Sequence, residues 1–197
     1  MARQYFNSQL ADSSIVSASI TPATTKTFLF TQARANQFFP LPAGLGVAAP
    51  FAGQIFRFAM GGLITTPATG TLIIEATHGP GSSATAGGTG MGPSPAQTVT
   101  ASLTNIPWRI EGELIYRTIA SSSLGSTAWL TGVFMSQGTL ATAGGGWVIP
   151  FGSSGAVTVD TSGLAGADLF GALNFYFTFS VTGATISAQW TSMQSLN

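Results

Sequence analysis

The sequence contains a single histidine, His78, the residue type most often used as a general base. In a nucleophilic triad the histidine is oriented by a carboxylate and lies within hydrogen-bond reach of a serine. Glu75 lies three residues before His78, and in a strand this spacing places the two side chains on opposite faces. No serine has the Gly-x-Ser-x-Gly surroundings of a nucleophile elbow. We therefore expect a strand-end histidine near a flexible loop, no catalytic residue and no enzyme activity.

Metal and phosphate sites are also poorly supported by the residue types. Zinc sites built from protein side chains need several His, Cys or carboxylate ligands, and the chain has one His and no Cys. Asp160 or Asp168 could hold calcium with backbone carbonyls, but no acidic loop motif surrounds them. The Gly-rich run Gly79–Gly92 has no lysine and does not end in Gly-Lys-Ser/Thr. The sequence predicts no metal site and no cofactor site.

Glu111 and Glu113 form the one pair of carboxylates with a spacing that suits chemistry. Two residues along a strand separate them by about 7 Å, a distance compatible with the acid pair of a glycosidase. Arg109 and Arg117, however, share the same strand face and offer opposite charge. We expect these residues to form a salt-bridge cluster, either across strands or between subunits.

The strand that carries this cluster, Pro107–Arg117, is the clearest element in the sequence. Strand side chains alternate between faces, so one face is predicted to be core and the other carries four of the twelve charged residues of the chain. We expect it to be a long central strand. The predicted core face consists of Trp108, Ile110, Gly112, Leu114 and Tyr116.

Alternation also predicts strands at Gln54–Met60, Thr127–Ser136 and Leu169–Val181. In the last of these, Leu173, Phe175, Phe177 and Phe179 share one face. The pair Gly61-Gly62 is expected to break the first of these strands. Further strands are expected at Thr27–Gln32, Leu63–Thr65, Thr71–Thr77, Gln97–Leu103, Trp147–Phe151, Val157–Thr161 and Thr185–Leu196.

These eight to ten strands, with no convincing helical period, predict an all-β antiparallel β-sandwich of jelly-roll type. An immunoglobulin-like sandwich is the alternative, although its Cys…Trp…Cys spacing is absent. We expect one domain at residues 27–197 and an N-terminal extended arm, or an edge strand, at residues 1–26. The Pro- and Gly-rich stretch Phe38–Phe51 is expected to be a loop, and Gly79–Pro95 an exposed one.

Composition limits the partners. Charged residues make up 6% of the chain, against about 25% in typical domains, and the formal net charge is zero. A near-zero charge favours association, so we expect assembly. Six scattered Lys and Arg residues give no basic patch for nucleic acid. There is no apolar run of membrane-spanning length and no signal peptide, so we expect no membrane partner and synthesis in the cytoplasm.

The four tryptophans, Trp108, Trp129, Trp147 and Trp190, are expected to lie mostly in the core of the sandwich. A sugar-binding platform would require exposed aromatic residues beside polar hydrogen-bonding groups. The sequence leaves this alternative open.

Several short motifs resemble small structural proteins of tailed bacteriophages. They are the run Pro107–Leu114 with Arg117-Thr118 behind it, the segment Val159-Asp160-Thr161, the strand Leu173–Phe179 and the closing Thr182–Ile186 with a terminal Leu196-Asn197. The similarity covers residues 107 to 197.

The resemblance implies a virion component on the exterior of the capsid, made in the host cytoplasm. Such a head decoration (cement) protein is commonly homotrimeric and binds the major capsid protein. Its N-terminal arm would grip the shell, here through Arg3, Tyr5, Phe6 and Lys26. The resemblance also allows an alternative, a tail-fibre or receptor-binding β-module that recognises a host-surface glycan, and the long loop at residues 79–95 leaves this open.

Overall fold

The computed structural model describes residues 8–13, 26–29, 40–42, 51–79, 89–99, 101–119, 126–136, 147–159 and 170–196. All the regular structure in these ranges is β-strand. No helix that could span a membrane occurs there. The expected all-β class is confirmed.

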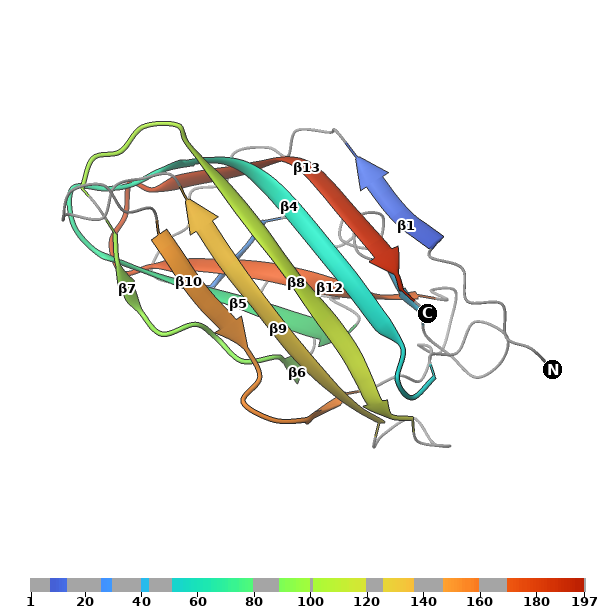
Figure 1. The fold of residues 1–197 in the computed structure, drawn as a ribbon. Helices are drawn as coiled ribbons and strands as arrows, with labels where there is room; N and C mark the ends of the chain where they lie inside the picture. Colours follow the sequence, from blue (N-terminus) through green and yellow to red (C-terminus); the bar gives the residue numbers. More distant parts are fainter. Residues whose placement is uncertain are drawn as a thin grey trace.

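The larger sheet, sheet A, has seven antiparallel strands among the described residues. Five of them lie side by side in the order β13, β4, β8, β9, β10 (Figure 1). The strand β1 pairs with the outer edge of β13, and β11 pairs with β9 beyond the end of β10. The bounds are β1 Ser8–Ser13, β4 Ile55–Thr65, β8 Ile106–Thr118, β9 Ser126–Ser136, β10 Trp147–Gly152, β11 Val157–Val159 and β13 Thr185–Ser195.

The second sheet, sheet B, lies behind the first (Figure 1) and has six antiparallel strands among the described residues. Its centre is the pair β5 and β12, which align over eight residue pairs. Short strands flank this pair, with β2 and β3 on β12, and β6 and β7 on β5. The bounds are β2 Thr27–Phe28, β3 Pro40–Pro42, β5 Thr71–Gly79, β6 Thr89–Gly90, β7 Gln97–Thr98 and β12 Phe170–Phe179.

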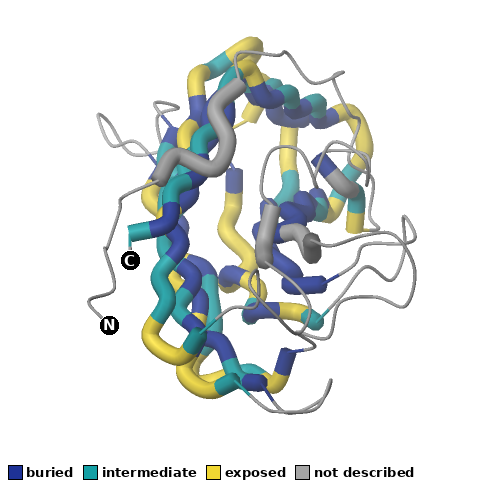
Figure 2. The backbone as a smooth tube through the Cα atoms, turned by 90° about the vertical axis from the view of Figure 1, so that its right-hand side faces the viewer, coloured by how far each residue is buried: buried dark blue, intermediate teal, exposed yellow. Residues whose placement is uncertain are grey.

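Two antiparallel sheets packed face to face confirm the predicted β-sandwich. Figure 2 shows the two layers edge-on, with buried and intermediate positions alternating along much of the strands of sheet A. The jelly-roll connectivity stays a prediction, as does the division into an arm and one domain. The described part of the expected arm includes β1, which is the edge strand of sheet A beside β13.

The prediction that Pro107–Arg117 is a central strand is confirmed. The strand β8 pairs with β4 on one side and β9 on the other, each over about ten residues. Trp108, Ile110, Leu114 and Tyr116 are buried, whereas Arg109 and Arg117 are exposed. The alternation therefore identified both faces.

Aromatic rings join the two sheets in the core. Trp108 of β8 stacks on Phe134 of β9, with ring centroids 5.8 Å apart, and lies 5.8 Å from Phe177 of β12. Phe58 of β4 contacts Phe175 of β12 at 5.2 Å. Buried aromatic side chains contribute a large apolar area, so these contacts hold the sheets together.

The prediction that Gly61-Gly62 breaks the strand is wrong. The strand β4 continues through both residues and pairs with β8 and β13 along its length. The glycines permit close approach: a Cβ on Gly61 would lie 2.6 Å from Nε1 of Trp190, and one on Gly62 would lie 1.8 Å from the carbonyl oxygen of Ser187. Glycine in a strand often marks such an approach.

Three other expectations differ from the structure. The expected strand Gln97–Leu103 is limited to the two residues of β7. The stretch Phe38–Phe51 is not entirely loop, because Pro40–Pro42 pairs with β12. In the expected exposed loop 79–95, residues 80–88 lie outside the described ranges, while Met91 and Ser94 are buried. Met91 and Ser94 donate backbone hydrogen bonds to Ala76 and Ile74 of β5, which fix this part of the segment against the sheet.

Candidate binding surface

The outer face of sheet A carries most of the charged residues of the described structure. Register pairs align the outward residues of β13, β4, β8, β9 and β10 into rows that cross the sheet. One end row contains Trp190, Gly61, Arg109, Met135 and Val148, and we call it the Trp190 row. The next two rows carry ion pairs, and the opposite end carries Trp129 beside Ile115.

The Trp190 row combines aromatic, cationic and aliphatic side chains on the solvent side of the sheet. The Arg109 guanidinium lies 5.7 Å from the Trp190 ring, within the range of a cation–π contact. The indole rests over Gly61, where a side chain would displace it. Val148 at the other end is 67% exposed. The row therefore presents a cation–π pair and an exposed aliphatic side chain on the solvent side of the sheet.

The two middle rows confirm that Glu111 and Glu113 form ion pairs. Glu111 pairs with Arg109 of the same strand at 2.8 Å. Glu113 pairs across the strands with Arg57 of β4, also at 2.8 Å, and this partner was not expected from the sequence. Exposed pairs of this kind contribute about 0–1 kcal/mol each, so they neutralise the face more than they stabilise the fold.

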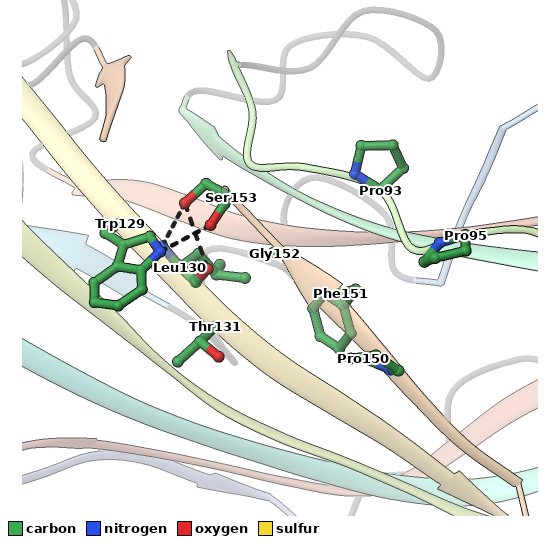
Figure 3. Close-up of a pocket in the computed structure, with 9 residues that line it drawn as sticks. All are labelled: Pro93, Pro95, Trp129, Leu130, Thr131, Pro150, Phe151, Gly152 and Ser153. Carbon is green, nitrogen blue, oxygen red and sulfur yellow. Dashed lines mark hydrogen bonds between the residues drawn. The ribbon is translucent and has the colours of Figure 1, made fainter. Parts of the chain in front are cut away.

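A depression of about 220 Å³, which we call the Trp129 pocket, lies at the Trp129 end of the sheet. Figure 3 shows its lining, which comes from β9, from β10 and the bend after it, and from the segment before β7. Trp129 is 38% exposed. None of the nine lining residues is charged: they are Pro93, Pro95, Trp129, Leu130, Thr131, Pro150, Phe151, Gly152 and Ser153.

Short hydrogen bonds fix the walls of this pocket. The Trp129 Nε1–H donates to the Ser153 carbonyl oxygen at 2.8 Å, as the dashed line in Figure 3 shows. The Ser153 N–H donates to the Leu130 carbonyl at 3.0 Å, and the Leu130 N–H donates to the Ser153 hydroxyl at 3.1 Å. The Gly152 N–H donates to the Gly92 carbonyl at 3.1 Å, which joins the third wall to the other two.

The outer face of sheet B has the opposite character. Glu75, Thr77, Asn174 and Tyr176 point outward from β5 and β12, yet each is at least nine-tenths buried. Glu75 forms an ion pair with Lys26, whose ammonium group also lies 6.0 Å from the Tyr176 ring. Among the described residues, the Thr77 hydroxyl and both amide atoms of Asn174 find no hydrogen-bond partner.

His78 lies in the core at the end of β5, and the prediction of a strand-end position is confirmed. Its Nε2 shares a hydrogen bond of 2.6 Å with the Tyr116 hydroxyl of β8, across the two sheets. Burial raises the pKa of Tyr116, so the phenol stays protonated. Glu75 points to the other face of β5, as its spacing predicts. The pair therefore joins the sheets.

The remaining residues singled out from the sequence fall into two groups. Lys26 lies on sheet B through its pair with Glu75 and is 57% exposed. Arg3, Tyr5, Phe6, Asp160 and Asp168 lie outside the described residues. Within the described ranges, no three His, Asp or Glu side chains cluster so as to hold a metal ion.

The Trp190 row could not be found from alternation alone. A β-bulge at Gln189 interrupts the pairing of β13 with β4, between Ala188 and Trp190. The bulge reverses the alternation, so Trp190 faces out and Thr191 is buried. Of the four tryptophans, Trp108 and Trp147 are core residues, and Trp129 and Trp190 lie on the outer face of sheet A.

Comparisons with known proteins leave the family open. No family model matches the chain, and no curated protein matches it in sequence. Among solved structures, the chain is similar to the CBM2 module of the evolved Dit of Lactobacillus casei BL23 phage J-1, at 10% identity, with 97% of this chain and 96% of that chain covered. The TM-score is 0.30, so this likeness carries no argument about function.

Proposed function

We propose that the chain is a structural protein of a bacteriophage virion, and within the virion a capsid decoration protein that stabilises the head shell. Two of the motifs that resemble phage structural proteins form central strands: Pro107–Leu114 lies in β8 of sheet A, and Leu173–Phe179 lies in β12 of sheet B. A decoration protein acts by burying surface on its neighbours and requires no reaction. The outer face of sheet A is suited to this role.

The observation that carries the proposal is the composition of this face. Protein interfaces are enriched in Trp, Met and Arg, and depleted in Lys, Glu and Asp. The face presents Trp129, Trp190, Met135 and Arg109, together with the ion-paired Glu111 and Glu113. Trp and Arg are also the residues that most often dominate binding energy. We place the protein contact on the Trp190 row.

A homotrimer on the capsid exterior remains part of the proposal, as does contact of the N-terminal arm with the major capsid protein. Many weak contacts on one shell add up through effective concentration, so a modest interface per copy suffices. Lys26 could contribute to such a contact only in competition with its pair to Glu75.

The proposal is tested by mixing the purified protein with undecorated capsids of the phage that encodes it. The wild type should saturate the shell and raise its melting temperature. Trp190→Ala should weaken shell binding at least about tenfold while leaving the fold intact, because an interface tryptophan often contributes 2 kcal/mol or more. Arg117→Ala, on the same face but outside the row, is the matched control and should bind like the wild type.

Deletion of residues 1–26 separates the two contributions. Loss of shell binding by the truncated protein would support the arm contact, and normal binding would leave the face of sheet A as the contact. The truncation also removes β1 and the Lys26 pair, so its thermal stability has to be measured alongside. A wild-type protein that ignores capsids would refute the decoration role.

The second candidate is a tail-fibre or receptor-binding module for a host-surface glycan. One observation favours it: an exposed tryptophan, Trp129, borders an uncharged pocket. Copy number distinguishes the candidates, because a decoration protein occurs in far more copies per particle than a fibre. Quantitative mass spectrometry of purified virions supplies that number.

A further inference from the structure

We infer that the Trp129 pocket binds one ring of a neutral saccharide, with the indole as the stacking platform. This inference rests on the second candidate function and names its site and ligand class. It does not require the decoration role, because the two sites lie at opposite ends of sheet A. Six residues along β8 separate the position beside Trp129 from the position beside Met135, which is about 20 Å.

The indole of Trp129 is held in one orientation. Its only polar group, the Nε1–H, donates to the Ser153 carbonyl oxygen at 2.8 Å. The ring therefore has no hydrogen bond left to offer, and its remaining exposed surface is apolar. A saccharide ring presents a patch of C–H groups that can lie flat on such a surface, and the fixed indole loses little entropy when a ligand binds.

The polar groups of the pocket select a ligand that donates hydrogen bonds. The N–H groups of Leu130, Gly152 and Ser153 are already used within the protein. Pro93, Pro95 and Pro150 have no N–H. What the lining still offers is the second lone pair of its carbonyl oxygens and the hydroxyl of the exposed Thr131. Saccharide hydroxyls supply the donors that such a site needs.

The same groups disfavour other ligand classes. None of the nine lining residues is charged, so nothing compensates the desolvation of an anionic or cationic group. Proline-rich peptides bind aromatic grooves by accepting hydrogen bonds through their carbonyls, and the indole N–H that could donate one is occupied here.

The size and rigidity of the pocket limit the ligand to a single ring. Its volume of about 220 Å³ is below the roughly 300–1,000 Å³ of sites for drug-sized ligands. The Phe151 ring packs against Gly132, where a Cβ would lie 2.5 Å from it, so this wall is closely fitted to β9. A longer glycan would extend out of the pocket over the surface.

The test is a titration of the full chain with a panel of neutral hexoses, N-acetylhexosamines and their disaccharides, followed by saturation-transfer NMR and tryptophan fluorescence. We expect at least one sugar to bind at millimolar concentration or tighter. Trp129→Ala should weaken it roughly tenfold or more, and Trp129→Phe less, because a smaller ring retains part of the stack. Thr131→Val should weaken binding a fewfold.

Val148→Ala is the matched control, since Val148 is exposed on the same sheet but does not line the pocket. It should bind sugar like the wild type. The inference is overturned if no sugar of the panel binds, if Trp129→Ala binds equally well, or if a proline-rich peptide shifts Trp129 signals and the sugars do not. Shell binding is read separately with Trp190→Ala, so failure of the decoration role leaves this outcome unaffected.

Discussion

The two outer faces of the sandwich treat polar and apolar groups in opposite ways. On sheet A, Trp129 and Val148 are exposed beside ion pairs. On sheet B, Thr77 and Asn174 are almost fully buried, although polar residues normally occupy the solvent side of an antiparallel sheet. Sheet A thus exposes large apolar side chains to solvent, whereas sheet B buries polar ones.

This difference favours the outer face of sheet A as the proposed contact face. When a partner covers exposed aromatic and aliphatic groups, the free energy of the system falls. A buried polar group without a hydrogen-bond partner destabilises the fold by about 1–3 kcal/mol. Thr77 and Asn174 are such groups within the described part of the chain. Binding at sheet A would therefore remove apolar side chains from water, whereas the polar groups of sheet B named above are already buried within the protein.

The largest effect is expected at Gly61, because the Trp190 indole occupies the space that a side chain at this position would need. Gly61→Val would place a Cβ 2.6 Å from the Trp190 indole and 2.8 Å from the Trp108 carbonyl oxygen. We expect the free energy of unfolding to fall by about 2–3 kcal/mol, since overpacking a fitted site forces side chains and backbone to shift. Urea denaturation measures this loss.

Gly155→Val is the control for this change, because a Cβ on Gly155 meets nothing within 4 Å. It should alter stability by less than about 0.5 kcal/mol. Equal losses in the two variants would mean that Gly61 does not seat the indole.

A matched pair of Glu→Gln variants compares the faces directly. Glu75→Gln removes the charge of a side chain that is 9% exposed and should cost about 1–2 kcal/mol, whereas Glu113→Gln, at 32% exposure, should cost less than about 0.5 kcal/mol. Thermal and urea unfolding of both proteins give the two values. The comparison of faces fails if Glu113→Gln is the more damaging change.

The pH dependence of stability reports on the core between the faces. Burial raises the pKa of Tyr116 above its ordinary value of about 10. Above that pH the unfolded chain releases this proton and the folded chain keeps it, so the free energy of unfolding falls as pH rises.

Tyr116→Phe lacks this proton, so the wild type should lose stability faster than the variant above pH 10, by up to about 1.4 kcal/mol per pH unit. Parallel denaturation curves at pH 8 and pH 11 measure the difference. Identical slopes would show that the phenol is not buried as described.

The smallest predicted effect is a gain. Thr77→Val removes a buried hydroxyl that has no hydrogen-bond partner among the described residues, and it should raise the free energy of unfolding by about 1 kcal/mol. Thr131→Val, at an exposed position of sheet A, should leave stability within about 0.5 kcal/mol of the wild type. A destabilised Thr77→Val protein would indicate that the hydroxyl has a partner.

The strands with regular alternation could be predicted from the sequence. The inner face of β8, with Trp108 to Tyr116, and that of β12, with Leu173 to Phe179, follow the two-residue period of a strand. The charge pairing of Glu111 and Glu113 followed from the same period, although alternation within one strand cannot reveal a cross-strand partner such as Arg57.

The candidate sites depend on features that a local pattern does not contain. A bulge at Gln189 turns Trp190 outward, and Gly61 leaves room for its ring. The Gly61-Gly62 pair, predicted to break the strand, therefore allows the indole to pack on it. The Trp129 pocket joins β9, β10 and the segment before β7, which are far apart in the sequence. The prediction of an exposed loop at residues 79–95 is wrong at Met91, because a backbone hydrogen bond holds this residue against β5, where its side chain is buried.

The most direct test of the proposed contact face is hydroxyl-radical footprinting of the free protein and of purified virions, read by mass spectrometry. Trp190 and Met135 are oxidised readily when accessible, and Met91 and Trp147, which are buried in the free protein, serve as internal references. We predict that Trp190 and Met135 are protected in the virion relative to the free protein. Unchanged oxidation of both residues would contradict the assignment of sheet A as the contact face.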